Sequence, residues 1–281
     1  MFDNAYEALS SEGDARWAFG TGFADPLSGV DTTVPADVDA SALAAYCLML
    51  ADDALVMSHR LQEWCTRAPE LEDEVALANI GLDLLGQARL LLTRAGKADG
   101  TDRSDDDFAF LREADDFRNV RLVELDNGDF AFSMARLLVF TTWRLAVLQR
   151  LVMSPDPVLA AIAAKGVKEV TYHRDYAAQW VVRLGDGTEL SHERMQAGLD
   201  AVWPYVGELF AGHPSELVDP ASVRDEFDAV ITQVLDAAGL ARPESVGVQE
   251  LLGRDGSHTS SLVELLAVMQ SVARAHPGAT W

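Results

Sequence analysis

The chain has 281 residues, 49% of them hydrophobic, which is enough for one large domain or two small ones with a substantial core. Because 45 Asp and Glu outnumber 22 Lys and Arg, the formal net charge is −23, so we expect neither nucleic acid nor an anionic membrane surface as a partner. We find no secretory signal, in which positive charge precedes an apolar segment. The sequence has no unbroken run of about 18 apolar residues, so it predicts no bilayer-spanning helix.

Residues 1–39 predict an extended, irregular N-terminal arm. The stretch "DPLSGVDTTVPADVD" is rich in Asp, Gly, Pro and Thr and has no helical period. Trp17, Phe19 and Phe23 lie close together in "RWAFGTGF", and a freely disordered tail has little use for three such aromatics. We expect the arm to be held at these aromatics, to lie across the surface of the domain and to reach a partner.

Residues 40–281 read as one helical domain. A first long helix is predicted over about 40–66, where apolar residues follow the 3.6-residue period, and it ends near Pro69. A second is predicted over about 71–95. Acidic residues crowd its start and basic residues its end, as the helix dipole favours, and Gly96 is a stop signal.

The two cysteines, Cys47 and Cys65, both fall in the first predicted helix. Eighteen helical positions span roughly 27 Å, far beyond the ~7 Å Cα separation that a disulfide tolerates. The pair therefore predicts two core thiols in a cytoplasmic protein.

The rest of the chain continues the helical pattern. An acidic loop over 99–107 leads to a short helix near 108–118 and then to a third long helix over about 129–153. Ser154 as N-cap and Pro155 at the first helical position predict the start of a fourth long helix, which ends near residue 184. Three further helices are expected over 191–211, 219–238 and 258–275. Since nothing alternates with period two for long, the fold class is all-α: a four-helix bundle with additional C-terminal helices.

A helical bundle can hold a carboxylate-bridged di-iron site, built from a carboxylate on each of two helices and Glu-x-x-His on each of the others. Among the histidines of the chain, only His192, after Glu189, and His258, after Asp255, have a carboxylate three residues earlier. Both lie at predicted helix starts beside Gly-rich turns, where capping explains them better than metal binding. Spacing alone yields no complete ligand set, and no phosphate-binding loop, catalytic triad or CxxC site stands out.

Two polar features on the long helices have more than one reading. His173 is either an interhelix histidine satisfied by a neighbour or an i,i+4 partner of Glu169. Asn79, Asp83 and Gln87 form either a solvated stripe or an interhelical hydrogen-bond seam. In "DLLGQARLLL", Leu84 and Gln87 occupy the places that Glu and His would take in a metal-binding Asp-Glu-x-x-His helix.

Several long motifs resemble those of the structural C subunit of the phenylacetyl-CoA epoxidase (phenylacetate-CoA oxygenase) family. They are "RLQEWCTRAPELE", "ALANIGLDLLGQARLLL", "DNGDFAFSMAR", "KEVTYHRDYAAQWVVRLGDGT" and "MQSVARAHPGATW". The likeness runs from about residue 40 to the C-terminus. It implies a ferritin-like subunit of a multicomponent bacterial monooxygenase, in which the di-iron site belongs to a paralogous catalytic subunit.

The resemblance also carries the catalytic subunit's six ligand positions onto this chain. They fall on Glu63, Leu84, Gln87, about Thr141, Val170 and His173. Only Glu63 and His173 keep a ligand type, so we expect a vestigial site that holds no metal, filled instead by apolar packing. Members of the family tend to read "HTE" near the C-terminal helix, whereas this chain reads "HTSS" over 258–261. No role of that Glu can be carried over.

The resemblance implies a non-catalytic subunit that pairs with and stabilises the di-iron catalytic subunit of a cytoplasmic oxygenase. The complex would epoxidise the ring of phenylacetyl-CoA, with electrons from NADPH delivered through a reductase subunit, and this chain itself would carry no cofactor. Two alternatives remain open. One is an autonomous di-iron or di-manganese oxidase with an unusual ligand set, and the other is a metal-free helical protein that binds an acyl-CoA.

Overall fold

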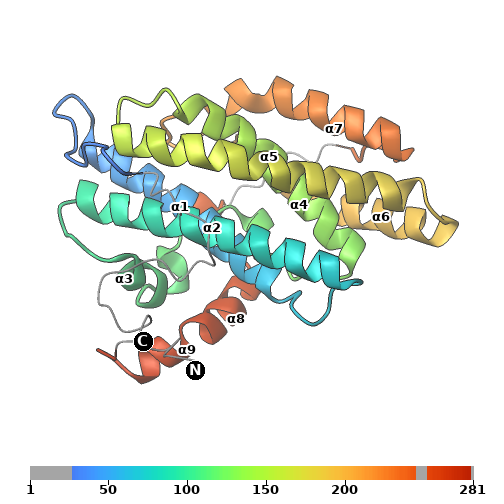
Figure 1. Cartoon of the computed structure of the whole chain (residues 1–281), viewed down its shortest axis with the longest axis horizontal. Helices are drawn as coiled ribbons and strands as arrows, with labels where there is room; N and C mark the ends of the chain where they lie inside the picture. Colours follow the sequence, from blue (N-terminus) through green and yellow to red (C-terminus); the bar gives the residue numbers. More distant parts are fainter. Residues whose placement is uncertain (1–26, 245–251, 280–281) are drawn as a thin grey trace, which may run out of the picture.

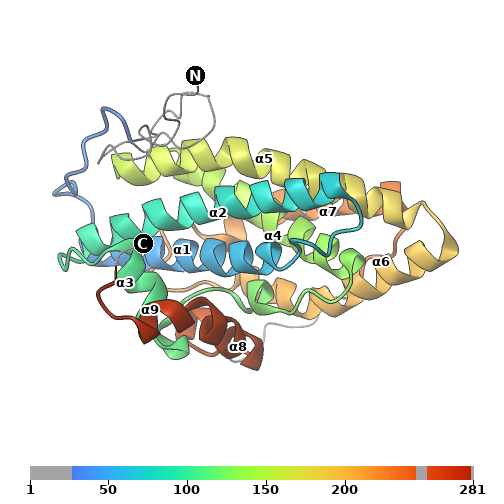
Figure 2. The same cartoon turned by 60° about the horizontal axis from the view of Figure 1, so that its bottom comes forward.

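Four long helices form the body of the molecule in the computed structural model, which describes residues 27–244 and 252–279 (Figures 1 and 2). They are α1 (Ala40–Gln62), α2 (Leu71–Ala98), α4 (Phe130–Leu151) and α5 (Pro157–Gly185). Short connections make α1 and α2, and then α4 and α5, neighbouring pairs, and a long crossover joins the pairs. The described residues contain no strand. The all-α prediction is confirmed, and the arrangement is consistent with a ferritin-like bundle.

Shorter helices surround this bundle. The crossover contains α3 (Asp105–Phe110) and the 3-10 turns η2 (Ala114–Asp116) and η3 (Arg121–Glu124). The C-terminal part contains α6 (Glu189–Val202), η4 (Trp203–Phe210), η5 (Pro220–Val223), α7 (Arg224–Ala238), η6 (Gly253–Asp255), α8 (Ser260–Met269) and α9 (Ser271–Ala275). Helices α6 and α7 pack on α4 and α5, whereas α8 lies against the other side of the molecule, near α1 (Figure 2).

Several predicted helix ends are wrong. The first helix ends at Gln62, so Cys65 lies beyond it in a turn. Cys47 is a core thiol as expected, but Cys65 is only half-buried. The fourth begins at Pro157 instead of Pro155. Its cap is Asp156, whose carboxylate accepts from the Leu159 amide at 2.8 Å and pairs with the buried Arg94.

The shorter predicted helices also differ from the structure. The helix expected over 108–118 is α3, which starts earlier because Ser104 and Asp107 form a capping box. The helix expected over 191–211 changes into the 3-10 segment η4 at Trp203, because Pro204 has no amide hydrogen for the α-helical ladder. Gly96 does not stop α2, which continues to Ala98.

Of the N-terminal arm, the structure describes residues 27–39. Leu27, Val30, Val34 and Val38 pack against the core, and Asp39 caps α1 by accepting from the amides of Ser41 and Ala42. Trp17, Phe19 and Phe23 lie outside the described residues, so the expectation that they hold the arm stays a prediction.

Three helices are long and apolar enough to cross a membrane by length and composition, although the sequence has no unbroken apolar run of that length. They are α1, α2 and α4, in which isolated polar residues interrupt the apolar run without lowering the mean hydropathy below 1.4. In their most apolar stretches, 94% of the α4 residues and 72% of the α1 residues are buried inside the bundle, but only 44% of those in α2. Helix α2 therefore has apolar surface that the described chain does not cover.

Candidate functional site

The four long helices meet at a buried hydrogen-bond chain centred on Arg144 of α4. Its Nε and Nη2 donate to Gln87 Oε1 of α2 at 3.1 and 3.0 Å, and its Nη1 donates to the Leu50 carbonyl of α1 at 3.1 Å. Gln87 Nε2 in turn donates to Glu169 Oε2 of α5 at 2.9 Å. Glu169 also pairs with Lys165. One continuous chain of polar groups thus ties all four helices together.

Arg144 places a positive charge in the middle of the bundle. The side chain is fully buried, and this burial lowers its pKa to about 10, while the negative charge of Asp53 opposes the shift and Arg254 adds to it. A guanidinium with this pKa is still charged near neutral pH. Burying it is tolerable because its donors find oxygen acceptors.

The positions expected to be vestigial metal ligands on α2, α4 and α5 are all buried, and Gln87 among them contacts this charge directly. Leu84 and Val170 are completely buried and offer no donor atom. The hydroxyl of Thr141, also buried, donates to the Leu137 carbonyl of its own helix at 2.7 Å. Gln87 is committed to Arg144 and Glu169, as described above.

His173 joins α5 to α2. Its Nε2 lies 3.0 Å from Asp83 Oδ2, and its buried Nδ1 has no partner among the described residues. The interhelix reading of His173 is therefore correct, since Glu169 turns to Gln87 instead of to the histidine. The polar line on α2 is an interhelical seam at Asp83 and Gln87, whereas Asn79 is exposed.

Glu63 is not brought to this centre. It caps the C-terminal end of α1, where it is partly exposed and bonded to Arg60 Nη1 and Asn127 Nδ2, each at 2.9 Å. The Arg144 network reaches α1 at Leu50, thirteen residues earlier, a separation of roughly 20 Å along a helix. The placement of a first-helix ligand on Glu63 therefore does not match the geometry of the bundle.

The residues at the bundle centre do not fit a carboxylate-bridged metal pair. Two of the positions are aliphatic, and the hydroxyl at a third is bonded to its own helix. Gln87, at a fourth, is bonded to the buried guanidinium of Arg144, a cation that repels metal ions. Within residues 27–244 and 252–279, no group of three or more His, Cys, Asp or Glu side chains could hold a metal ion.

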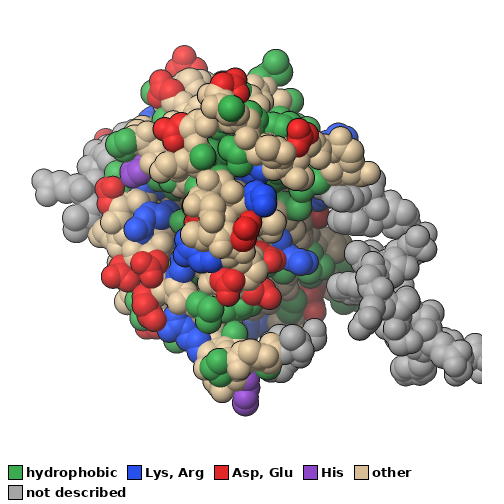
Figure 3. Space-filling view, turned by 90° about the vertical axis from the view of Figure 1, so that its left-hand side faces the viewer, with side chains coloured by type: hydrophobic (Ala, Val, Ile, Leu, Met, Phe, Trp, Pro, Cys, Tyr) green, Lys and Arg blue, Asp and Glu red, His purple; other side chains and the backbone are tan. Residues whose placement is uncertain are grey.

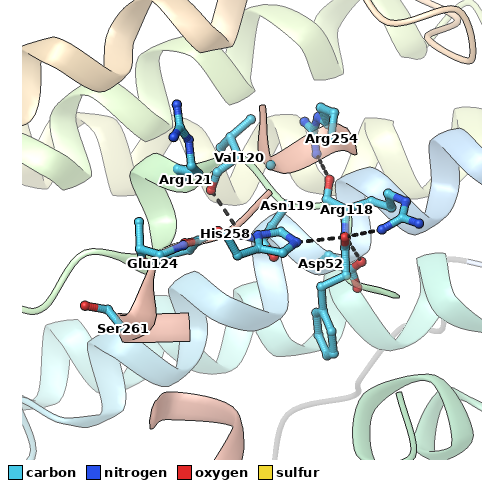
Figure 4. Close-up of polar contacts among 12 residues, drawn as sticks. Asp52, Arg118, Asn119, Val120, Arg121, Glu124, Arg254, His258 and Ser261 are labelled. Carbon is cyan, nitrogen blue, oxygen red and sulfur yellow. Dashed lines mark hydrogen bonds and ion pairs between the residues drawn. The ribbon is translucent and has the colours of Figure 1, made fainter. Parts of the chain in front are cut away.

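A second buried network fastens the C-terminal segment to the bundle (Figure 4). Asp53 of α1 pairs with Arg254 at 2.7 and 3.0 Å, and the neighbouring Asp52 pairs with Arg112 at 2.5 and 2.9 Å. The adjacent "DD" inside an otherwise apolar helix was the sequence signal for these pairs, because two buried carboxylates require partners.

His258 belongs to this network and is not a helix cap. Its Nδ1 lies 2.5 Å from Glu124 Oε1, and its Nε2 lies 2.9 Å from the Phe117 carbonyl. Glu124 also accepts from the Thr259 amide at 2.7 Å. His192, the other histidine with a matching spacing, lies in the first turn of α6, with Nδ1 2.7 Å from the Gly185 carbonyl at the end of α5.

A cavity of about 400 Å³ lies between residues 27–32, the end of α2 and α3, at the left-hand end of Figure 1. Figure 3 faces this end and shows Lys and Arg side chains interleaved with Asp and Glu. The cations lining the cavity are all paired: Arg94 with Asp156, Lys97 with Asp102 at 3.3 Å, and Arg103 with Asp99 at 2.9 Å. The cavity therefore presents no unmatched positive charge to the phosphates of a CoA ester.

These features define an all-α bundle of the ferritin-like kind whose four long helices are joined at the centre by hydrogen bonds around a buried arginine. A family model described as "Phenylacetic acid catabolic protein" matches residues 28–281. The C subunit of the 1,2-phenylacetyl-CoA epoxidase of Escherichia coli (strain K12) is 41% identical over 247 residues, which cover 85% of this chain and 99% of that protein. The chain belongs to the phenylacetic acid catabolic protein family, and the resemblance seen in its motifs is confirmed.

Proposed function

We propose that this chain is the non-catalytic structural subunit of a cytoplasmic phenylacetyl-CoA epoxidase. It pairs with the di-iron catalytic subunit of the same oxygenase and stabilises it. The complex epoxidises the ring of phenylacetyl-CoA with oxygen and with electrons that a reductase subunit takes from NADPH. The observation that carries this proposal is the 41% identity with an epoxidase C subunit along nearly its whole length, joined to a bundle centre unsuited to metal.

The buried polar chain supports a role in shape and assembly. Arg144, Gln87 and Glu169 link the four long helices through matched hydrogen bonds, so the network fixes how the helices are placed relative to one another. Chemistry on oxygen would need open coordination positions or a redox group at this point. The space is instead occupied by side chains that already have partners or are aliphatic.

The two alternative functions have less support. An autonomous di-metal oxidase would require carboxylates where Leu84 and Val170 stand. An acyl-CoA-binding protein would require free cations for the phosphates, but those around the cavity at the end of α2 are engaged by aspartates. Isothermal titration of the lone chain with phenylacetyl-CoA tests the second alternative, and no heat of binding is expected.

Co-expression with the catalytic subunit tests the proposal directly. We expect a stable complex in size-exclusion chromatography and epoxidation only when the catalytic subunit and the reductase are both present. The catalytic subunit purified without this chain should be less soluble or less active. Turnover by this chain with the reductase alone, at a rate comparable to the complex, would refute the proposal, as would failure of the two subunits to associate.

A further inference from the structure

Helix α2 carries a second apolar face that points away from the core of this chain. Its inner face, which includes Leu77, Leu84 and Leu91, is buried. On the outer side lie Leu71, Val75, Ala78, Leu82 and, at its edge, Leu85, which also packs against the core; these five are here called the α2 stripe. Leu71, Val75 and Leu82 are 71%, 53% and 56% exposed, and the other two are partly exposed. Figure 2 shows α2 between α1 and α5, so its outer side forms part of the molecular surface.

The spacing of the α2 stripe is that of a helix-helix contact. Successive members are four, three, four and three residues apart, the heptad pattern in which side chains of one helix fit between those of another. A single exposed leucine needs no explanation, but five apolar positions in register over roughly 21 Å of helix do. The stripe contributes to the low buried fraction of α2, 44% against 94% for α4, together with polar residues such as Asn79 and Arg89.

The charges beside the stripe indicate what covers it. Glu72 and Glu74 flank its first turns and form no ion pair with any described residue. In a parallel pairing with a second copy, these acids would face each other. In an antiparallel pairing of the stripe with itself, centred on Ala78, they would face positions 84 and 82 of the copy, where no cation lies. A chain of net charge −23 also repels its own copies.

We propose that the α2 stripe is the docking surface for the catalytic subunit, through a helix that has an apolar heptad stripe with Lys or Arg beside it. This inference rests on the proposed function, since it takes the catalytic subunit as the partner, and adds the surface and the chemistry of the contact. Leu82, near the middle of the stripe, is the expected anchor, because central apolar residues dominate the affinity of such interfaces. The acids Glu72 and Glu74 set the orientation of the partner helix.

The test compares Leu82→Glu with Met153→Glu, in the purified full-length chain, for affinity to the catalytic subunit. Met153 is 85% exposed in the turn between α4 and α5, outside the α2 stripe, so its variant makes a comparable apolar-to-acidic change. Leu82→Glu should weaken binding roughly ten- to a hundredfold, and Met153→Glu should change it by less than about twofold. Glu72→Lys should weaken binding as well, with an effect that shrinks at high salt.

The outcomes separate this inference from the proposed function. If the wild-type chain binds the catalytic subunit and Leu82→Glu binds it equally well, the docking surface is wrong and the function stands. If the wild-type chain does not bind, both are wrong. Two controls on the lone chain address other occupants of the stripe. A fall in melting temperature confined to Leu82→Glu would assign the stripe to another part of this chain, and a homodimer that Leu82→Glu dissociates would assign it to a second copy. Either result overturns the inference.

Discussion

Replacing Gln87 by leucine should destabilise the bundle far more than loss of one hydrogen bond would suggest. Gln87 Oε1 accepts from both Nε and Nη2 of Arg144, and among the described residues these donors have no other acceptor. Gln87→Leu preserves most of the side-chain volume but leaves a buried guanidinium with two unmatched donors. Glu169 also loses a donor, although Lys165 still pairs with it.

The magnitude follows from the cost of an uncompensated buried charge. Removing one partner of a buried charged group typically costs about 3–5 kcal/mol, which for a chain of this size lowers the melting temperature by roughly 6–10 °C. Arg144→Met alone leaves Gln87 Oε1 without a donor, at about 1–3 kcal/mol, and removal of the buried charge offsets part of this loss. The double variant replaces the whole contact by apolar groups of similar volume, so its stability should lie within about 2 kcal/mol of the wild type.

Thermal and urea unfolding of the wild type, both single variants and the double variant form a double-mutant cycle. We expect the double variant to be more stable than Gln87→Leu. Gln179→Leu, at an exposed glutamine of α5, is the matched control and should leave the melting temperature nearly unchanged. A Gln87→Leu protein with the melting temperature of the wild type would refute the reasoning. A double variant whose loss of unfolding free energy equals the sum of the losses in the single variants would refute it as well.

Four further outcomes are expected. Burial, with the nearby charge of Arg60, lowers the pKa of His59, so the unfolded state takes up a proton first and stability falls as the pH drops below about 6.5. His59→Gln should flatten the melting temperature between about pH 7 and 5, and an unchanged slope would contradict this. Glu124 accepts hydrogen bonds on both carboxylate oxygens. In Glu124→Gln, the NH₂ group of the new amide must therefore face a hydrogen-bond donor. Hydrogen exchange in α8 should accelerate relative to the exposed control Glu264→Gln, and equal rates would count against the network. Elemental analysis of the purified chain should find no stoichiometric iron, and two irons per chain would reverse that expectation. A variant that carries four substitutions at the expected ligand positions should be destabilised before any metal site forms, because the new carboxylates are buried without metal. The substitutions are Leu84→Glu, Gln87→His, Thr141→Asp and Val170→Glu.

The sequence predicts the four long helices well because their apolar residues repeat with the helical period over more than 20 residues each. Helix ends are less predictable, since they depend on partners elsewhere in the chain. Ser154 and Asp156 are both acceptable caps locally. The structure uses Asp156, whose carboxylate also pairs with Arg94, 62 residues away. Pro204 is the exception, because its local effect on the helix over 191–211 could have been read from the sequence.

In the candidate site, too, features set by local sequence could be predicted, and features set by distant parts of the chain could not. Spacing of three within one helix puts Leu84 with Gln87 and Val170 with His173, and the structure places both pairs as expected, facing the bundle interior. The position of Glu63 failed because it depends on how far α1 slides along α2, and no local pattern records that register. Arg144 and Arg254 were missed because their partners Leu50 and Asp53 lie 94 and 201 residues away.

Arg144 gives the bundle centre a cation that can organise helices but cannot do redox chemistry. In a di-iron bundle, metal ions offset the charge of inward-pointing carboxylates and hold their helices together. Here Asp53 and Glu169 still contribute negative charge near the centre, and the guanidinium opposes it while reaching three other helices directly or through Gln87. A guanidinium has no open coordination position and its pKa keeps it charged. Hydrogen bonds from this arginine thus join the helices at the bundle centre, which is consistent with the proposed structural role. What then distinguishes the molecule is its surface, and the α2 stripe is the part of that surface with the pattern of a helix contact, which supports a role in assembly.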